Sequence, residues 1–217
     1  MVATAQRPGE IAATADQRAY FHNVPWAYYE ILLALRGESA VPRLSYLNGT
    51  LEIMTPSHGH EGAKKSLARL VEAYADALDI RLNGFGSWTL KSAPKERGAE
   101  PDECYIRGDA KGHETPDFAI EVAWTSGGID KLEIYRGLGV REVWFWEEGK
   151  IDVFELTGGA YERIPRSDVL PEIDLALIAR LMEEHEDQYD AVRALRSALA
   201  RTSKRPRKRK TTSRRTR

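Results

Sequence analysis

The chain has 217 residues, of which 42% are hydrophobic and 30% charged, with a net charge of −1. This composition is typical of a soluble globular protein with one sizeable domain. No run of about 18 apolar residues is present, and the first residues lack the apolar centre of a signal peptide. A single cysteine, Cys104, excludes an internal disulfide and a cysteine-based zinc site. We therefore expect a cytoplasmic protein that does not span a membrane.

The charges are distributed unevenly along the chain. Residues 201–217 hold ten Lys or Arg residues and no acid, so the first 200 residues hold 22 bases (32 − 10) against 33 acids. A segment of this composition without apolar periodicity is expected to be disordered. It could neutralise nucleic-acid phosphates, fold back on the acidic body, or only aid solubility. The candidate phosphate-binding residues are Lys204, Arg205, Arg207, Lys208, Arg209 and Lys210.

Residues 1–18 are polar and rich in alanine, which predicts a disordered N-terminus before a folded domain over residues 19–200. In that domain, Pro25 opens an apolar helical pattern that ends at Gly37. The dipeptide Asn48-Gly49 then separates two short apolar runs, which is a strong hairpin signal. The predicted hairpin strands are Arg43–Leu47 and Leu51–Met54.

A second helix is predicted to begin near Ser57 and to reach about Ile80. Its apolar residues recur with a period of 3.6: they are Ala63, Leu67, Leu70, Val71, Tyr74 and Leu78. When this stripe is extended backward at 100° per residue, His60 falls on the buried face and Glu61 at its edge.

Residues Phe118 to Trp124 read as a buried strand that carries a charge. Pro116 precedes this run, and glycines follow it. Glu121 lies in its middle, where a carboxylate costs several kcal/mol unless a cation, a metal or a proton meets it. The next helix, Asp130 to Leu138, has Lys131 in its first turn, where the helix dipole disfavours a cation. A nearby carboxylate would explain that lysine.

The remaining pattern is mostly extended until a final helix. The predicted pieces are Ile80–Leu82, Ser87–Leu90, Glu103–Ile106, a hairpin of Val143–Trp146 and Ile151–Leu156, an edge strand Tyr161–Ile164, and a helix Leu175–Ala200. This order predicts an α/β or α+β domain with a central mixed sheet packed on helices.

A second acidic residue, Asp102, heads an inward-facing row if its strand begins there. Carboxylates from neighbouring strands, Asp102 and Glu121, could lie within a few ångströms of each other. Both can then stay ionised only if a cation lies between them. A hard divalent ion such as Mg²⁺ suits two carboxylates with waters and a phosphate oxygen. Lys131 could direct its ammonium at an attacking water or at the charge developing on phosphorus.

The sequence resembles the pattern of the PD-(D/E)xK nuclease superfamily, which has an acidic residue after a proline, a second acidic residue on the next strand and a nearby lysine. Within it, the chain is similar to the Uma2 family, also called DUF820. The similarity spans most of residues 21–175, through FHNVPW, LNGTLEIMTPS, EPDECY, PDFAIEV, TSGGIDKLEIY and LGVREVW.

The resemblance implies a restriction-endonuclease-like core and roles for five residues. Asp102 and Glu121 would be metal ligands for Mg²⁺ or Mn²⁺, Lys131 would assist catalysis, and His60 and Glu61 would complete the site from their helix. One departure stands out: the superfamily places a lysine two residues after the second acid, where this chain has Ala123. Uma2-like sequences often offer a lysine on the following helix instead, which here is Lys131.

Each residue also has a structural explanation. Glu121 could be salt-bridged inside the sheet, Asp102 could be a turn residue, and Lys131 could be a surface lysine. His60 could be a core histidine, and Glu61 an acid in a favourable first helical turn.

The sequence therefore supports two hypotheses about function. The first is a divalent-metal-dependent endonuclease that acts on nucleic acid, expected to be DNA, as a homodimer. The alternative is a catalytically inactive nuclease fold that binds nucleic acid or associates with itself, which the alanine at position 123 suits.

Overall fold

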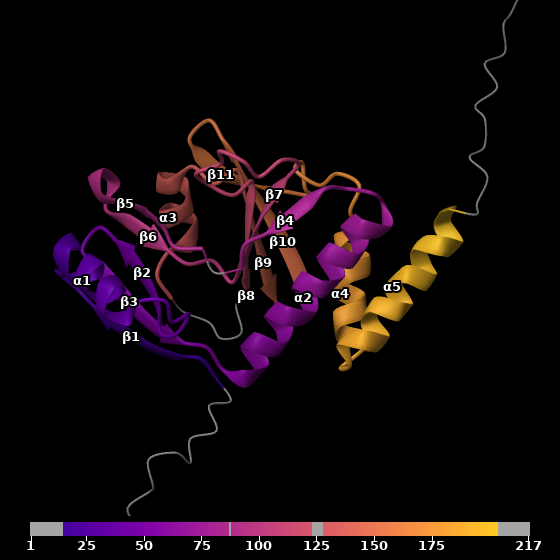
Figure 1. Ribbon diagram of the computed structural model, residues 1–217, viewed down its shortest axis with the longest axis horizontal. Coiled ribbons are helices and arrows are strands. Elements are labelled where there is room, and N and C mark those ends of the chain that lie inside the picture. Colours follow the sequence, from indigo (N-terminus) through magenta and orange to yellow (C-terminus); the bar gives the residue numbers. More distant parts are fainter. Residues whose placement is uncertain (1–14, 87, 123–127, 204–217) are drawn as a thin grey trace, which may run out of the picture.

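The computed structural model describes residues 15–86, 88–122 and 128–203 (Figure 1). Two β-sheets and five α-helices make up this part of the chain. The helices are α1 Trp26–Arg36, α2 His58–Ala77, α3 Lys131–Leu138, α4 Leu175–Glu184 and α5 Gln188–Ser203, and a short 3-10 turn spans Ala93–Lys95.

The first sheet, sheet A, has five strands in the order β1-β3-β2-β6-β5. Each neighbouring pair is antiparallel. The strands are β1 Gln17–Phe21, β2 Arg43–Leu47, β3 Thr50–Thr55, β5 Leu90–Ser92 and β6 Arg97–Ala99.

The second sheet, sheet B, has six strands in the order β11-β10-β9-β8-β7-β4. It is mixed, because β8 and β9 run parallel while the other neighbours are antiparallel. Its strands are β4 Leu82–Gly84, β7 Glu103–Arg107, β8 Phe118–Val122, β9 Glu142–Glu147, β10 Lys150–Thr157 and β11 Ala160–Ile164.

Sheet B is covered on both faces. Helices α2, α4 and α5 lie on one side of it, and α3 and sheet A, with α1 outside, lie on the other (Figure 1). The larger core packs α2, α4 and α5 against side chains such as Phe118, Ile120 and Trp144. The smaller core packs α3 against the opposite face, which includes Cys104 and Ala119. A strand buried on both faces explains why β8 is an unbroken apolar run apart from Glu121.

The α+β prediction is confirmed, with one refinement. The hairpin β2–β3 forms at Asn48-Gly49, where both residues have the positive φ angles (44° and 83°) that a two-residue hairpin turn requires. It belongs to sheet A, however, and not to the central sheet. The hairpin that the sequence predicts in addition to the central sheet is thus part of a second sheet of five strands.

The prediction that residues 1–18 are disordered is wrong for its last two residues. Gln17 and Arg18 belong to β1, which pairs with β3 from Gln17↔Thr55 to Phe21↔Leu51. Residues 1–14 lie outside the described residues, as does the basic segment Lys204–Arg217.

The predicted helix Leu175–Ala200 is also wrong, since the chain forms two helices there. The break has a physical cause in Asp187, whose Oδ1 accepts the backbone N–H of Tyr189 at 2.7 Å and of Asp190 at 3.1 Å. A side chain that accepts these N–H groups starts a new helix. Among the described residues, no helix combines the length and apolarity needed to cross a membrane.

Candidate active site

The register of β7 and β8 brings the two predicted acids together. Glu103, the first residue of β7, pairs with Ile120, so Asp102 stands just before the strand at the end of β8 that carries Glu121. Its Oδ2 accepts the N–H of Val122, the neighbour of Glu121. Both side chains are almost completely buried, with exposed fractions of 0% for Asp102 and 8% for Glu121.

Glu121 is held by two groups from α3. Lys131 Nζ donates to Glu121 Oε1 at 3.2 Å, and the Tyr135 hydroxyl donates to the same oxygen. Lys131 and Tyr135 are four residues apart, which places them on one face of the helix. Burial, reinforced by the Glu121 carboxylate, raises the pKa of Tyr135 well above its usual range. Glu121 Oε2 accepts no hydrogen bond from the residues that the structure describes.

Asp102 has partners on both oxygens. His60 Nε2 lies 2.7 Å from Oδ1, Arg43 forms an ion pair with the same oxygen, and the Val122 N–H donates to Oδ2 at 2.6 Å. These groups come from α2, β2 and β8 respectively. The carboxylate is therefore fixed in position by three different elements of the fold.

His60 lies between two carboxylates. Its Nδ1 is 3.0 Å from Asp16 Oδ2, on the side of the ring opposite Asp102. The helix start is fixed by Ser57, whose Oγ accepts the His60 backbone N–H at 3.1 Å. Burial lowers the pKa of His60, and the negative charge of Asp16 opposes this. A neutral imidazole can donate to only one of its two carboxylate neighbours, whereas an imidazolium donates to both.

Glu61 lies at the edge of this cluster. Its side chain is 41% exposed, and it pairs with Lys64 at 2.6 Å and with Arg43 at 3.0 Å. Burial would raise the pKa of Glu61, but the hydrogen bond from Lys64 and its positive charge outweigh burial and lower it. Glu61 therefore reaches Asp102 only through Arg43.

A cavity of about 230 Å³ opens beside these groups. Its ionisable lining consists of Arg18, His60, Glu121, Asp130 and Lys131, and its apolar lining includes Met54, Leu132 and Phe145. Acids and bases from four parts of the chain converge on this one space. Such convergence of ionisable groups is what a catalytic or binding site requires.

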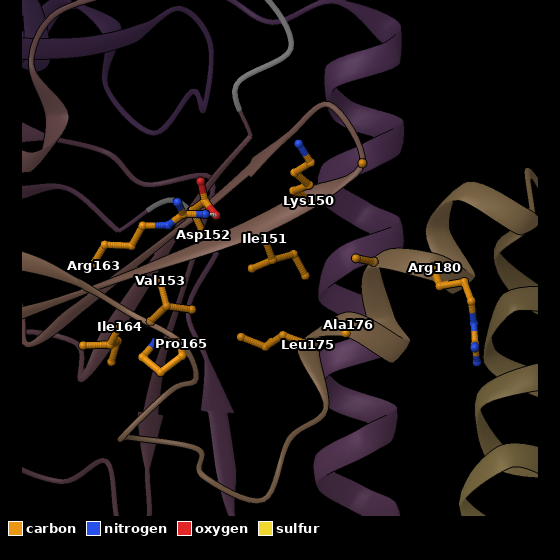
Figure 2. A pocket seen from close by; sticks show the side chains of 12 residues that line it. Lys150, Ile151, Asp152, Val153, Arg163, Ile164, Pro165, Leu175, Ala176 and Arg180 are labelled. Carbon is orange, nitrogen blue, oxygen red and sulfur yellow. Dashed lines mark hydrogen bonds and ion pairs between the residues drawn. The ribbon is translucent and has the colours of Figure 1, made fainter.

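A larger cavity of about 720 Å³ lies elsewhere, between the strands β10 and β11 and helix α4 (Figure 2). Asp152 and Arg163 point toward each other there and form an ion pair, while Ile151 and Leu175 supply apolar walls. The acid that lines this cavity, Asp152, is thus paired with Arg163, and the other charged lining residues are the cations Lys150 and Arg180. We assign the chemistry to the smaller cavity because it collects the unusual buried ionisable groups.

Glu100 anchors the segment that leads into Asp102. Arg36 of α1 contacts both oxygens of its carboxylate, Thr89 Oγ1 donates at 2.6 Å, and the Leu44 N–H donates at 3.2 Å. Burial would raise the pKa of Glu100, but these hydrogen bonds outweigh it, so the pKa is lowered. Two residues before Asp102, the chain is thereby tied to α1 and to sheet A.

Comparison with known proteins agrees with the resemblance found in the sequence. The sequence model of the Uma2 family, described as "Putative restriction endonuclease", matches residues 26–181. The chain belongs to the Uma2 family. A solved structure of a "putative nuclease belonging to DUF820" from Anabaena variabilis ATCC 29413 is 16% identical, with 75% of this chain and 96% of that chain covered and a TM-score of 0.42. No curated protein matches the chain.

The structure of this Uma2 protein brings four of the five predicted site residues into one cluster. Asp102, Glu121, Lys131 and His60 lie around the cavity or in contact with a residue that lines it. Glu61 is separated from it by Arg43. Catalytic or ligand roles for these residues stay predictions. Ala123 and the predicted basic residues 204–210 lie outside the described residues.

Three contacts of the cluster were not predicted from the sequence. Tyr135 had a signal, since it follows Lys131 by one helical turn. The signal for Arg43 was weaker: the alternation of side chains along its strand assigns it to one face of the hairpin. Asp16 had none, because it stands in a polar segment without periodicity.

The donor set of this Uma2 protein fits an ion that needs few protein ligands. Mg²⁺ uses one or two carboxylates and completes its shell with waters and phosphate oxygens. Asp102 and Glu121 would supply the carboxylates, and no residue that the structure describes donates a hydrogen bond to Glu121 Oε2. Within residues 15–86, 88–122 and 128–203, no group of three or more His, Cys, Asp or Glu side chains is placed to hold a metal. The fit is therefore to an open two-carboxylate site and not to a closed cage.

Proposed function

We propose that this protein is a divalent-cation-dependent endonuclease that hydrolyses phosphodiester bonds in nucleic acid. The observation that carries the proposal is the Glu121–Lys131 contact of 3.2 Å at a cavity that is also lined by His60, the partner of Asp102. It pairs a buried acid with the helix lysine that takes the place of the usual strand lysine. Membership of a family described as a restriction endonuclease supports the same reaction class.

In this mechanism Asp102 and Glu121 hold the cation. When bound, such an ion acts as a Lewis acid on the phosphoryl oxygens. Lys131, which lines the cavity with a side chain that is 13% exposed, would stabilise the negative charge that develops on phosphorus. His60 would hold Asp102 in place through the 2.7 Å contact.

Cleavage of supercoiled plasmid DNA with Mg²⁺ or Mn²⁺ tests this proposal. Asp102→Asn and Glu121→Gln keep the side-chain shapes and should abolish cleavage, as should EDTA. Lys131→Met should lower kcat by about 10²-fold, the usual cost of removing one group that stabilises transition-state charge. Asp76→Asn, an exposed acid on α2, is the matched control and should cleave like the wild type. Equal cleavage by all variants would reveal a contaminant and refute the assignment.

A second candidate is a non-catalytic protein that binds nucleic acid. It is favoured by Ala123 and by the cations already paired with both acids, namely Arg43 with Asp102 and Lys131 with Glu121. DNA binding without cleavage under any cation, unchanged in Glu121→Gln, would support it. RNA in place of DNA in both assays tests the other polymer.

The basic segment and the homodimer are further parts of the proposal. If Lys204–Arg217 contacts phosphates, a protein ending at Ser203 should bind DNA more weakly and with a flatter dependence on salt. Unchanged affinity and salt dependence would exclude that role. Light scattering after size exclusion measures the oligomeric state, and a monomeric mass would contradict the dimer.

A further inference from the structure

The residues before β1 reach the proposed site. Gln17 pairs with Thr55, so the register of β1 and β3 carries Asp16 alongside the residues that open α2. Asp16 Oδ1 accepts the Ser57 N–H at 2.9 Å, and Oδ2 lies 3.0 Å from His60 Nδ1. Asp16 is completely buried at its side chain. One acid thus joins the helix cap and the imidazole.

Asp16 is an ionised acceptor in this arrangement. Burial would raise its pKa, but the Ser57 N–H and His60 outweigh burial and lower it. Arg18 adds an ion pair at 3.2 Å. An ionised carboxylate only accepts hydrogen bonds, so the contact with His60 requires a hydrogen on Nδ1, and Nε2 donates to Asp102 at the same time when the ring is an imidazolium. The bond from Nδ1 fixes the plane of the ring, with Nε2 directed at Asp102.

These contacts form a continuous chain from Asp16 through His60 to Asp102, with distances of 3.0 and 2.7 Å. Asp16 lies outside the range that matches the family, which begins at residue 26. His60 and Asp102 lie inside that range, so the contact that Asp16 adds is the part of the chain that the family match does not cover.

We propose that Asp16 is a positioning residue of the site, which orients His60 and through it the carboxylate of Asp102. The consequence for catalysis rests on the proposed nuclease function, whereas the orientation of His60 can be measured without it. Removal of an outer partner that orients a site residue typically lowers activity by about 10–100-fold.

The test compares Asp16→Ala and Asp16→Asn with the wild type and with Asp76→Asn. An asparagine can place its single oxygen toward either Ser57 or His60, so Asp16→Asn should be intermediate. We expect kcat for plasmid cleavage to fall by about tenfold or more in Asp16→Ala, with KM within about twofold. Thermal unfolding followed by circular dichroism shows whether each variant is folded at the assay temperature. If Asp16→Ala is unfolded there, the comparison is made with Asp16→Asn.

The second readout is the ring ¹⁵N spectrum of histidine-labelled protein, in which His60→Gln assigns the His60 signals. Asp16→Ala should shift the Nδ1 resonance of His60, and Asp76→Asn should leave it in place. Unshifted His60 resonances in both folded Asp16 variants would overturn the positioning role, whatever the activity. If the wild type cleaves nothing while the Nδ1 signal shifts, the positioning role stands and the nuclease function fails. If Asp16→Ala lowers both kcat and thermal stability but leaves the Nδ1 resonance of His60 in place, Asp16 has only a structural role, and the proposal is overturned.

Discussion

The buried ion pair between Arg36 and Glu100 gives the sharpest prediction about stability. The exposed side-chain fractions are 10% for Arg36 and 3% for Glu100, and both terminal guanidinium nitrogens, Nη1 and Nη2, contact the carboxylate. Glu100→Gln leaves the arginine charge buried without its partner, which typically costs about 3–5 kcal/mol in the free energy of unfolding. Arg36→Met leaves the carboxylate with only Thr89 and the Leu44 N–H, and should cost a similar amount.

The double variant Arg36→Met/Glu100→Gln separates pairing from burial. Since both charges are then absent, its loss should be smaller than the sum of the single losses by about 2–3 kcal/mol. Urea unfolding with comparison of m-values measures all four proteins. The exposed pair Arg141–Asp168, with fractions of 52% and 61%, is the control and should show a coupling below about 1 kcal/mol. A loss below about 1 kcal/mol in Glu100→Gln, with no coupling, would refute the reasoning.

Three further predictions follow from single residues. Because the pKa of Glu100 is lowered, its contribution to stability is complete above the ordinary value of 4.5 and is lost as the pH falls through the lowered pKa. The difference in unfolding free energy between wild type and Glu100→Gln, measured by urea titration, should therefore shrink on acidification. A difference that stays constant with pH would contradict this. A Cβ added at Gly62 in α2 meets open space, so Gly62→Ala should stabilise the protein by about 0.5–1 kcal/mol. A Cβ added at Gly98 would meet the buried Tyr29 hydroxyl, so Gly98→Ala should destabilise the protein by about 1–3 kcal/mol. Unfolding midpoints equal to that of the wild type would contradict both. Burial raises the pKa of Cys104 to about 12, so its thiol should react with Ellman's reagent only after unfolding, and rapid native-state reaction would contradict that burial.

Much of the site could be predicted because its residues violate local rules. Glu121 is a charge in a run that is otherwise apolar, and Lys131 stands where a helix disfavours a cation. These two anomalies explain each other, since the side chains meet at 3.2 Å. His60 was placed on the buried face of its helix by a period of 3.6, and it is 1% exposed. A local pattern indicates a site where one residue is energetically unfavourable in its position unless a partner of opposite charge contacts it.

The remaining features depend on distant pairing, which a local pattern does not encode. β1 is a short strand whose only sheet neighbour among the described residues, β3, is about 30 residues away. Asp16 acquires its role from that pairing alone. The division of the last helix did have a local signal in Asp187, but the apolar spacing on both sides of it continues and concealed the break.

The range matched by the family starts after β1 and stops inside α4, which bears on how this protein should be trimmed for expression. A fragment limited to residues 26–181 would strip away the outermost strand of sheet A and leave the backbone of β3 open to other chains, a common route to aggregation. It would also remove Val192 and Leu195, which fill the larger core. Fragment ends chosen from hydrogen bonding and burial, before Asp16 and after Ser203, keep both the sheet and the core intact.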